Sequence, residues 1–285
     1  MENYTGKIIA CVITLLLCLV MPIVLAIVFA SRHREEKLGK AWLIGAAGFL
    51  VPQVVVRLPI LSALSSMAAF EGWAESHLLL YTLLTAFTAA FAELLGRCAG
   101  AGLLRREMTC RQALAAGMGH GGIESILLIG VTYTNNLAYL IMLQTGRFDA
   151  LVAEAAASGV DTAELTAAAL ALQAPSAWLF LLAALERVLT MVCQAGMTVM
   201  VFYGFYRRKP LRWLLGCLGI HFLLDCLTGV NLVIHQQWLA YTLVYTLLAV
   251  IAAACMVLLR RLLVKWKAET EKKPVEALPE KGDFL

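Results

Sequence analysis

The chain has 285 residues, of which 61% are hydrophobic and 15% are charged, and its mean hydropathy is +0.80. Soluble domains average about 45–50% apolar and about 25% charged residues. The composition therefore excludes an ordinary soluble domain and indicates an integral membrane protein. The formal net charge of +4 is small for the length of the chain, and we expect no nucleic-acid partner.

Seven apolar segments account for most of the sequence, and each is long enough to cross a bilayer core, which takes about 20 helical residues. They cover residues 7–30, 41–64, 77–98, 112–141, 176–206, 211–234 and 238–263. We therefore predict an all-α fold, a polytopic bundle of transmembrane helices over residues 1–266. The polar stretch 267–285 contains Pro274 and Pro279 and is expected to be a disordered cytoplasmic tail.

Lysine and arginine are unevenly distributed along the chain. Four lie in each of the ranges 31–40, 97–111 and 207–212, and seven lie after residue 259, so these parts hold 19 of the 23. The positive-inside rule places these parts in the cytoplasm, with the N-terminus outside and the C-terminus inside. The basic residues directly after segment 7–30 predict that it is retained as a span and is not a cleaved leader.

The largest predicted outer loop covers residues 142–175. It contains the sequence D-T-A-E from Asp161 to Glu164, followed by a run of Ala and Leu to Leu172. An acid before such a run, with Glu three residues later, is typical of a capped helix start. We expect a short helix that lies over the outer face.

Nine ionisable side chains fall inside the apolar segments. A charged residue at the centre of a membrane helix costs roughly 2.5–3.5 kcal/mol, so nine of them must face one another or water. They are Arg57, Glu93, Arg97, His120, Glu124, Glu186, Arg187, His221 and Asp225. Buried histidines and carboxylates are typical of hydrolysis or proton transfer, which makes these segments candidates for a functional site.

Four of the nine form two pairs with helical spacing, His120 with Glu124 and His221 with Asp225. Residues four apart project from one helix face. At 1.5 Å per residue, each histidine lies about 14 Å and each acid about 20 Å from the basic residue at the cytoplasmic end of its span, which is Arg111 or Arg212. Spans four and six run in the same direction, so the two pairs can meet at one depth and form a shared site.

Close helix packing is also expected in span four, because four glycines occur within Gly117–Gly122. Two of them have the G-x-x-x-G spacing that lets another backbone approach closely. A helix crossing with His120 bonded to a backbone carbonyl remains the structural alternative to a functional histidine. The neighbouring Glu124 favours the functional interpretation.

The remaining charges allow more than one interpretation. Glu93 and Arg97 are four apart and form either an ion pair at a helix end or part of the site. Glu186 and Arg187 are adjacent and should point about 100° apart, so we do not expect both to face one groove. For Arg187 and Arg57, charge balance within the bundle is the preferred interpretation, and an acid is one candidate partner of Arg57.

Three short motifs follow one another in spans three to six. Members of the Abi/CAAX-type intramembrane protease superfamily, which includes the CAAX-processing and PrsW-like proteases, carry E-E-x-x-x-R, F-x-x-x-H and H-x-x-x-(N/D) in this order. The chain resembles this superfamily over residues 77–234, and within it most closely the bacterial YhfC family of intramembrane metalloproteases. Glu93 and Arg97 match the first motif, His120 the second, and His221 with Asp225 the third.

Two positions depart from these motifs. Ala92 replaces the leading Glu of the first motif, and Ala116 stands where the second has its aromatic residue. The missing acid leaves open whether Glu93, Glu124 or Glu186 is the general base.

The resemblance implies a role for each matched residue. Glu93, assisted by His120, would activate a water molecule, while His221 and Asp225 would orient water or stabilise the oxyanion. Asp225 would have to be protonated to donate a hydrogen bond, which burial among carboxylates favours.

A metal ion is the other expectation, because two histidines and several carboxylates offer enough ligands for a catalytic Zn²⁺. The candidate ligands are His120, Glu124, Glu186 and His221, and Arg57, Arg97, Glu186 and Arg187 are candidate supporting residues. The chain contains no H-E-x-x-H, and a Glu/His pair can also activate water without a metal.

Together these features predict a bacterial plasma-membrane protease that contacts the lipid bilayer and cleaves a peptide or membrane-protein substrate. Two alternatives stay open at this point: a proton- or metal-coupled transporter, for which intramembrane acids and histidines are equally natural, and a catalytically inactive membrane scaffold.

Overall fold

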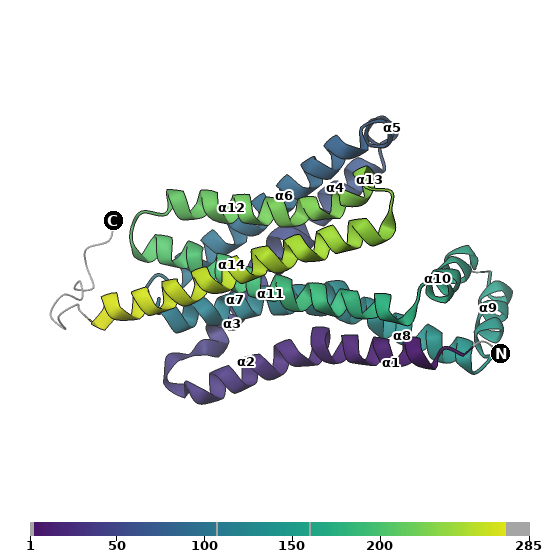
Figure 1. Ribbon diagram of the computed structural model, residues 1–285, viewed down its shortest axis with the longest axis horizontal. Helices are drawn as coiled ribbons and strands as arrows, with labels where there is room; N and C mark the ends of the chain where they lie inside the picture. Colours follow the sequence, from purple (N-terminus) through teal and green to yellow (C-terminus); the bar gives the residue numbers. More distant parts are fainter. Residues whose placement is uncertain (1–2, 107, 160, 272–285) are drawn as a thin grey trace.

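The computed structural model describes residues 3–106, 108–159 and 161–271, and these residues are arranged as a bundle of helices (Figure 1). Within them, seven helical stretches are long and apolar enough to cross a membrane. They are Thr5–Arg32, Leu38–Ser65, Leu78–Leu103, Cys110–Gln144, Ala177–Tyr206, Leu211–Val233 and Gln237–Glu271. The predicted multi-pass bundle of seven spans is confirmed, and its orientation in the membrane stays a prediction.

The first, second and fourth spans are each interrupted by a π-helical turn. The first span consists of α1 (Thr5–Leu15), a turn at Leu16–Val20 and α2 (Met21–Arg32). The second consists of α3 (Leu38–Phe49), a turn at Leu50–Arg57 and α4 (Leu58–Ser65). The fourth consists of α7 (Cys110–Ser125), a turn at Ile126–Gly130 and α8 (Val131–Gln144). The third span is α6 (Leu78–Leu103) and the fifth is α11 (Ala177–Tyr206). The sixth is α12 (Leu211–Cys226), a 3-10 turn at Leu227–Gly229 and α13 (Val230–Val233), and the seventh is α14 (Gln237–Glu271).

Proline explains the first of these π-helical turns. Pro22 has no N–H, so it cannot donate to the carbonyl of Cys18 one turn earlier. The hydroxyl of Ser125, on α7, donates to that carbonyl instead, at 3.0 Å. A backbone group without a partner is costly in lipid, and the neighbouring span supplies the missing donor.

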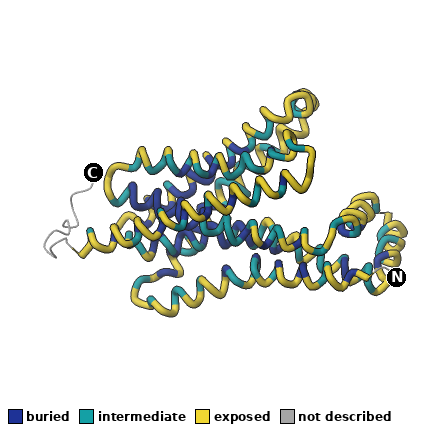
Figure 2. Tube along the Cα trace, viewed as in Figure 1, coloured by how far each residue is buried: buried dark blue, intermediate teal, exposed yellow. Residues whose placement is uncertain are grey.

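Glycines bring α7 close to its neighbours. A Cβ added to Gly119 would collide with the carbonyl of Trp42 on α3, and one added to Gly117 would lie 2.8 Å from the Cα of Ala195 on α11. The close approach predicted for this segment is therefore confirmed. It places α7 between α3 and α11, where most of its residues are buried (Figure 2).

The other spans pack around this centre. α11 also contacts α14, α12 and α1, while α12 and α3 pack on α6. Buried residues gather in the middle of the bundle (Figure 2). Many large apolar side chains are exposed on its outside. An apolar exterior around a buried polar interior is what a bilayer requires.

The connections contain more helix than expected. The predicted loop helix is present as α10 (Ala163–Gln173), and Asp161 Oδ1 accepts a hydrogen bond from the Ala163 backbone N–H at 2.9 Å. Two helices were not anticipated, α5 (Ala68–Ser76) and α9 (Phe148–Ala157). At the other end α14 continues to Glu271, so residues 267–271 of the predicted tail are helical, and 272–285 lie outside the described residues.

The glycine contact in α7 leads to a stability prediction. Gly119→Ala should lower the free energy of unfolding by about 1–3 kcal/mol, because the added methyl group overpacks the contact with α3. Gly219→Ala, in another span, is the matched control, since a Cβ there meets nothing within 4 Å. Thermal unfolding in detergent would measure both, and equal melting temperatures for the two variants would contradict the prediction.

Candidate functional site

A polar cluster lies inside the bundle, built by four spans. α6 contributes Glu93 and Arg97, α7 contributes His120 and Glu124, α11 contributes Glu186, Arg187 and Gln194, and α12 contributes His221 and Asp225. Seven of these nine are classed as buried, and Glu186 and Asp225 are partly exposed. Eight of them were candidates from the sequence, and in the structure these eight and Gln194 form one connected group.

Glu93 is the centre of the cluster. Its Oε2 lies 2.8 Å from His120 Nε2 and 3.6 Å from His221 Nε2. These three residues are 1–3% exposed and come from three different spans. The two histidine-bearing helices therefore do meet at one level, as predicted from residue counts, and the acid of α6 joins them.

Arg97 contacts the same atoms. Its Nη2 lies 3.0 Å from His120 Nε2 and 3.4 Å from Glu93 Oε2, and it also donates to Gln194 Oε1. An imidazole nitrogen carries either one proton or one lone pair, so His120 Nε2 cannot bond both Glu93 and Arg97 at once. Two hydrogen-bond patterns compete at this nitrogen, and they differ in whether the nitrogen bears a proton.

The pair on α12 is looser. His221 Nε2 lies 3.6 Å from Asp225 Oδ2, beyond hydrogen-bonding distance but on the shared helix face that the spacing predicted. The Asp225 side chain is 31% exposed, so it lies at the border of the cluster. Neither His221 Nδ1 nor Asp225 Oδ2 has a hydrogen-bond partner among the described residues.

Glu124 belongs to a second ion pair. Its Oε1 accepts from Arg187 Nη1 at 2.9 Å, and its Oε2 accepts from Gln194 Nε2 at 2.5 Å. Arg187 also donates to Glu186. Charge balance was the preferred interpretation of Arg187, and these contacts agree with it.

Two expectations about the remaining charges need correction. Glu186 and Arg187 were not expected to face one groove, yet the long Arg187 side chain reaches both its neighbour and Glu124. An acid was one candidate partner of Arg57. Arg57 donates instead to Thr88 Oγ1 at 3.1 Å and to the Thr85 carbonyl at 2.7 Å, because the rotation of the second span turns it towards α6.

Two residues of this region were not predicted from the sequence. Gln194 carries no charge and follows no motif, although a glutamine in an apolar segment is itself a signal of a polar contact. Phe49 lies on α3, with its ring edge-on to the His120 imidazole at 5.7 Å between centroids. The motif aromatic is absent at Ala116, and an aromatic ring from another helix contacts the histidine.

A divalent cation fits one group in the cluster. Glu93, His120 and Glu124 each offer a ligand atom, and these atoms lie within 4.8 Å of one another. Nitrogen and carboxylate oxygen donors suit Zn²⁺ and related metals. Of the four ligands proposed from sequence, His120 and Glu124 belong to this group, Glu186 and His221 do not, and Glu93 was not among them.

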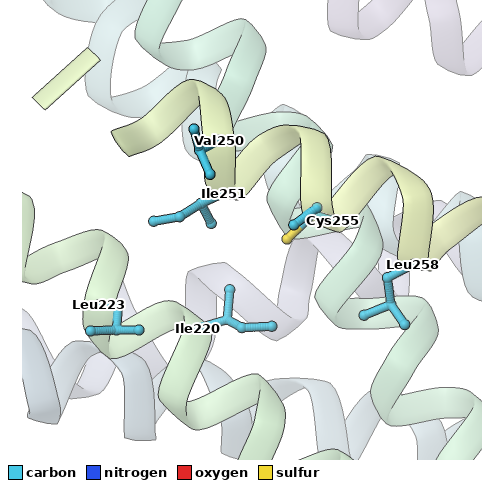
Figure 3. A pocket seen from close by; sticks show the side chains of 7 residues that line it. Ile220, Leu223, Val250, Ile251, Cys255 and Leu258 are labelled. Atoms are coloured by element: carbon cyan, nitrogen blue, oxygen red, sulfur yellow. The ribbon is translucent and has the colours of Figure 1, made fainter. Parts of the chain in front are cut away.

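An apolar groove of about 230 Å³ lies beside the cluster, between α12 and α14 (Figure 3). Ile220 and Leu223 line it from α12, on either side of His221 in sequence, and Val250, Ile251 and Cys255 line it from α14. The polar cluster and an apolar surface thus lie on the same stretch of α12.

Comparison with known proteins gives the family. A family model described as YhfC intramembrane metalloprotease matches residues 17–252, which is most of the chain. The chain belongs to the YhfC family. An uncharacterized membrane protein YhfC of Bacillus subtilis (strain 168) is 27% identical over 218 residues, which is 76% of this chain and 80% of that protein. No solved structure matches the chain.

The family resemblance drawn from the motifs is therefore confirmed, and the YhfC match includes every member of the polar cluster. The protein is a multi-pass membrane protein of this family. The family's name describes a metalloprotease, which agrees with a buried group of two acids and a histidine.

The two kinds of ion pair in this YhfC protein should differ in stability. Arg187→Leu should lower the free energy of unfolding by about 3–5 kcal/mol, because it leaves the buried Glu124 without its cation. Arg207→Leu should cost at most about 1 kcal/mol, because the Arg207–Glu269 pair is partly exposed. Unfolding of both variants in the same detergent checks this, and similar losses would refute the difference.

Proposed function

We propose that this YhfC protein is an intramembrane peptidase that hydrolyses peptide bonds of membrane-associated substrates. The observation that carries the proposal is the contact of Glu93 with His120 and His221, which joins three spans at membrane depth. Buried ionisable groups are expensive in a bilayer and mark functional sites. A carboxylate beside two imidazoles is the arrangement that general acid–base hydrolysis needs.

Glu93 is the best candidate for the general base. Both oxygens of Glu124 already accept hydrogen bonds, one from Arg187 and one from Gln194. Glu186 pairs with Arg187, and its side chain is 40% exposed. Glu93 Oε2, in contrast, faces the two imidazole nitrogens and only a long contact from Arg97.

The proposed reaction follows from this arrangement. Glu93, hydrogen-bonded to His120, accepts a proton from a water molecule, and the oxygen of that water attacks the peptide carbonyl carbon. The same proton then passes to the leaving amine as the C–N bond breaks, so the acid returns to its starting state. His221 stabilises the charge that develops on the carbonyl oxygen, and Asp225, at the border of the cluster, orients water.

The donor set also supports a metal-dependent alternative, in which Glu93 would be a ligand of the ion and not the free base. Glu93, His120 and Glu124 would hold a divalent ion such as Zn²⁺. A bound ion would acidify water and polarise the carbonyl. Each carboxylate oxygen has two lone pairs, so Glu124 can keep its bonds to Arg187 and Gln194 and still be a ligand.

Metal analysis tests this part directly. Purified wild-type protein should contain about one zinc-like ion per chain, as three close ligands imply, and His120→Ala should lose it. His77→Ala is the matched control, because His77 is exposed and its ring bonds the carbonyl of Trp73 on α5, away from the cluster. If the wild-type protein is free of metal after purification without chelators, the metal-dependent alternative is refuted. Water activation by Glu93 and His120 alone then remains.

Proteolysis itself can be tested without a known substrate. Membrane proteins from cells that express wild type, Glu93→Gln or Glu71→Gln would be compared by labelling of new N-termini. Glu93→Gln should lower cleavage at least about 100-fold by removing the base. Glu71 is exposed on α5, so its variant should cleave normally. Identical N-termini from wild type and Glu93→Gln, with both proteins folded, would refute the peptidase.

A second candidate function has one observation in its favour. Contacts run without interruption from Glu186 through Arg187, Glu124, Gln194 and Arg97 to Glu93. Ionisable groups that contact one another within the spans are also natural in a proton-coupled transporter, where Glu93 and His120 would carry the proton and the two arginines would only balance charge. Proton-dependent flux in sealed vesicles that is lost in Glu93→Gln would favour a transporter. If the protein is a scaffold, Glu93→Gln should change only its assembly with other proteins.

A further inference from the structure

Gln194 connects the two halves of the polar cluster. Its Oε1 accepts from Arg97, which contacts Glu93 and His120, and its Nε2 donates to Glu124 at 2.5 Å. Gln194 is 3% exposed and lies on α11, which contacts both α6 and α7. One amide therefore bonds a cation through its oxygen and an anion through its nitrogen.

The helix packing creates room for this amide. A Cβ on Gly121 would lie 3.0 Å from the Cβ of Gln194 and 3.3 Å from the Cα of Met191. Glycine at this position of α7 lets α11 approach until Gln194 reaches both partners. The position is thus built by two helices.

The chemistry of the two partners requires an amide here. Arg97 offers only donors and Glu124, as a carboxylate, offers only acceptors, so the bridging group must accept at one end and donate at the other. A glutamate would repel Glu124, and an apolar residue would leave both partners short of a bond. The Nε and Nη1 groups of Arg97 have no partner among the described residues, so Gln194 is a main constraint on its guanidinium.

We propose that Gln194 is a positioning residue, which holds Arg97 against Glu93 and His120 and ties this group to the Glu124–Arg187 ion pair. The inference rests on the proposed function where it concerns cleavage, because Glu93 and His120 are the reacting pair. The contact between Gln194 and Arg97 does not depend on the proposed function, because it predicts energetic coupling between these two residues. Nothing in the motifs or the family match assigns this residue.

The test is a double-mutant cycle with a matched control. Gln194→Met keeps the length of the side chain and removes both bonds. Gln112→Met does the same at another buried glutamine, which bonds Thr109 and Glu36 outside the cluster. Each is combined with Arg97→Met, or with Arg97→Lys if that variant does not fold.

Cleavage is measured on a peptide that spans a site found by the labelling of new N-termini. Gln194→Met should lower kcat at least about tenfold with little change in KM, because it displaces Arg97 from Glu93 and His120 without removing a substrate contact. Gln112→Met should keep kcat, even where its melting temperature falls. The loss in the Gln194–Arg97 double variant should be no larger than that in the Arg97 variant alone, whereas independent sites would multiply. Wild-type kcat in Gln194→Met, or multiplying losses, would overturn the positioning role.

The melting temperatures of the same variants need no substrate. The changes in melting temperature should be non-additive for the Gln194 and Arg97 variants and additive for the Gln112 and Arg97 variants. This result supports the bridge even if the wild type cleaves nothing. In that case the proposed peptidase function is refuted, and the proposed bridge between Arg97 and Glu124 is retained. Additive shifts for Gln194 and Arg97 overturn the bridge whatever the protein cleaves.

Discussion

The arrangement of this YhfC protein depends on the burial of Glu93 at membrane depth. A carboxylate in that environment is tolerated only where other groups compensate it, and here two imidazoles and a guanidinium from three spans do so. Because each partner comes from a different helix or helix turn, the charge fixes the rotation of α6, α7 and α12 relative to one another. The requirement that stabilises the bundle also assembles the chemical groups.

Close backbone contacts set the distances within that assembly. Side-chain hydrogen bonds of about 3 Å are possible across helices only if the axes approach closely, and α7 approaches α3 and α11 through glycines at positions 117, 119 and 121. The same segment carries His120 between two of those glycines and Glu124 one turn later. Small residues and ionisable residues are therefore neighbours in one stretch of sequence, and the contacts of the second depend on the close packing of the first.

The cluster divides into two parts with different environments. Glu93 lies among imidazoles, where protons can be exchanged, while Glu124 is held at both oxygens by Arg187 and Gln194. Two acids of the same chemistry thus differ in the groups that surround them. This difference is what favours one of them as a base and the other as an anchor or metal ligand.

The sequence by itself determined the seven spans, the charged positions within them and the helix faces that His120, Glu124, His221 and Asp225 share, because hydropathy and helical periodicity are local properties. It also indicated the family, through motifs whose order and spacing are local. Only the tertiary structure decided that His221 meets Glu93, that Arg57 bonds threonines, and that Gln194 links Arg97 to Glu124. These pairings depend on how each helix is rotated and how closely it crosses its neighbours, and residues distant in the chain set both.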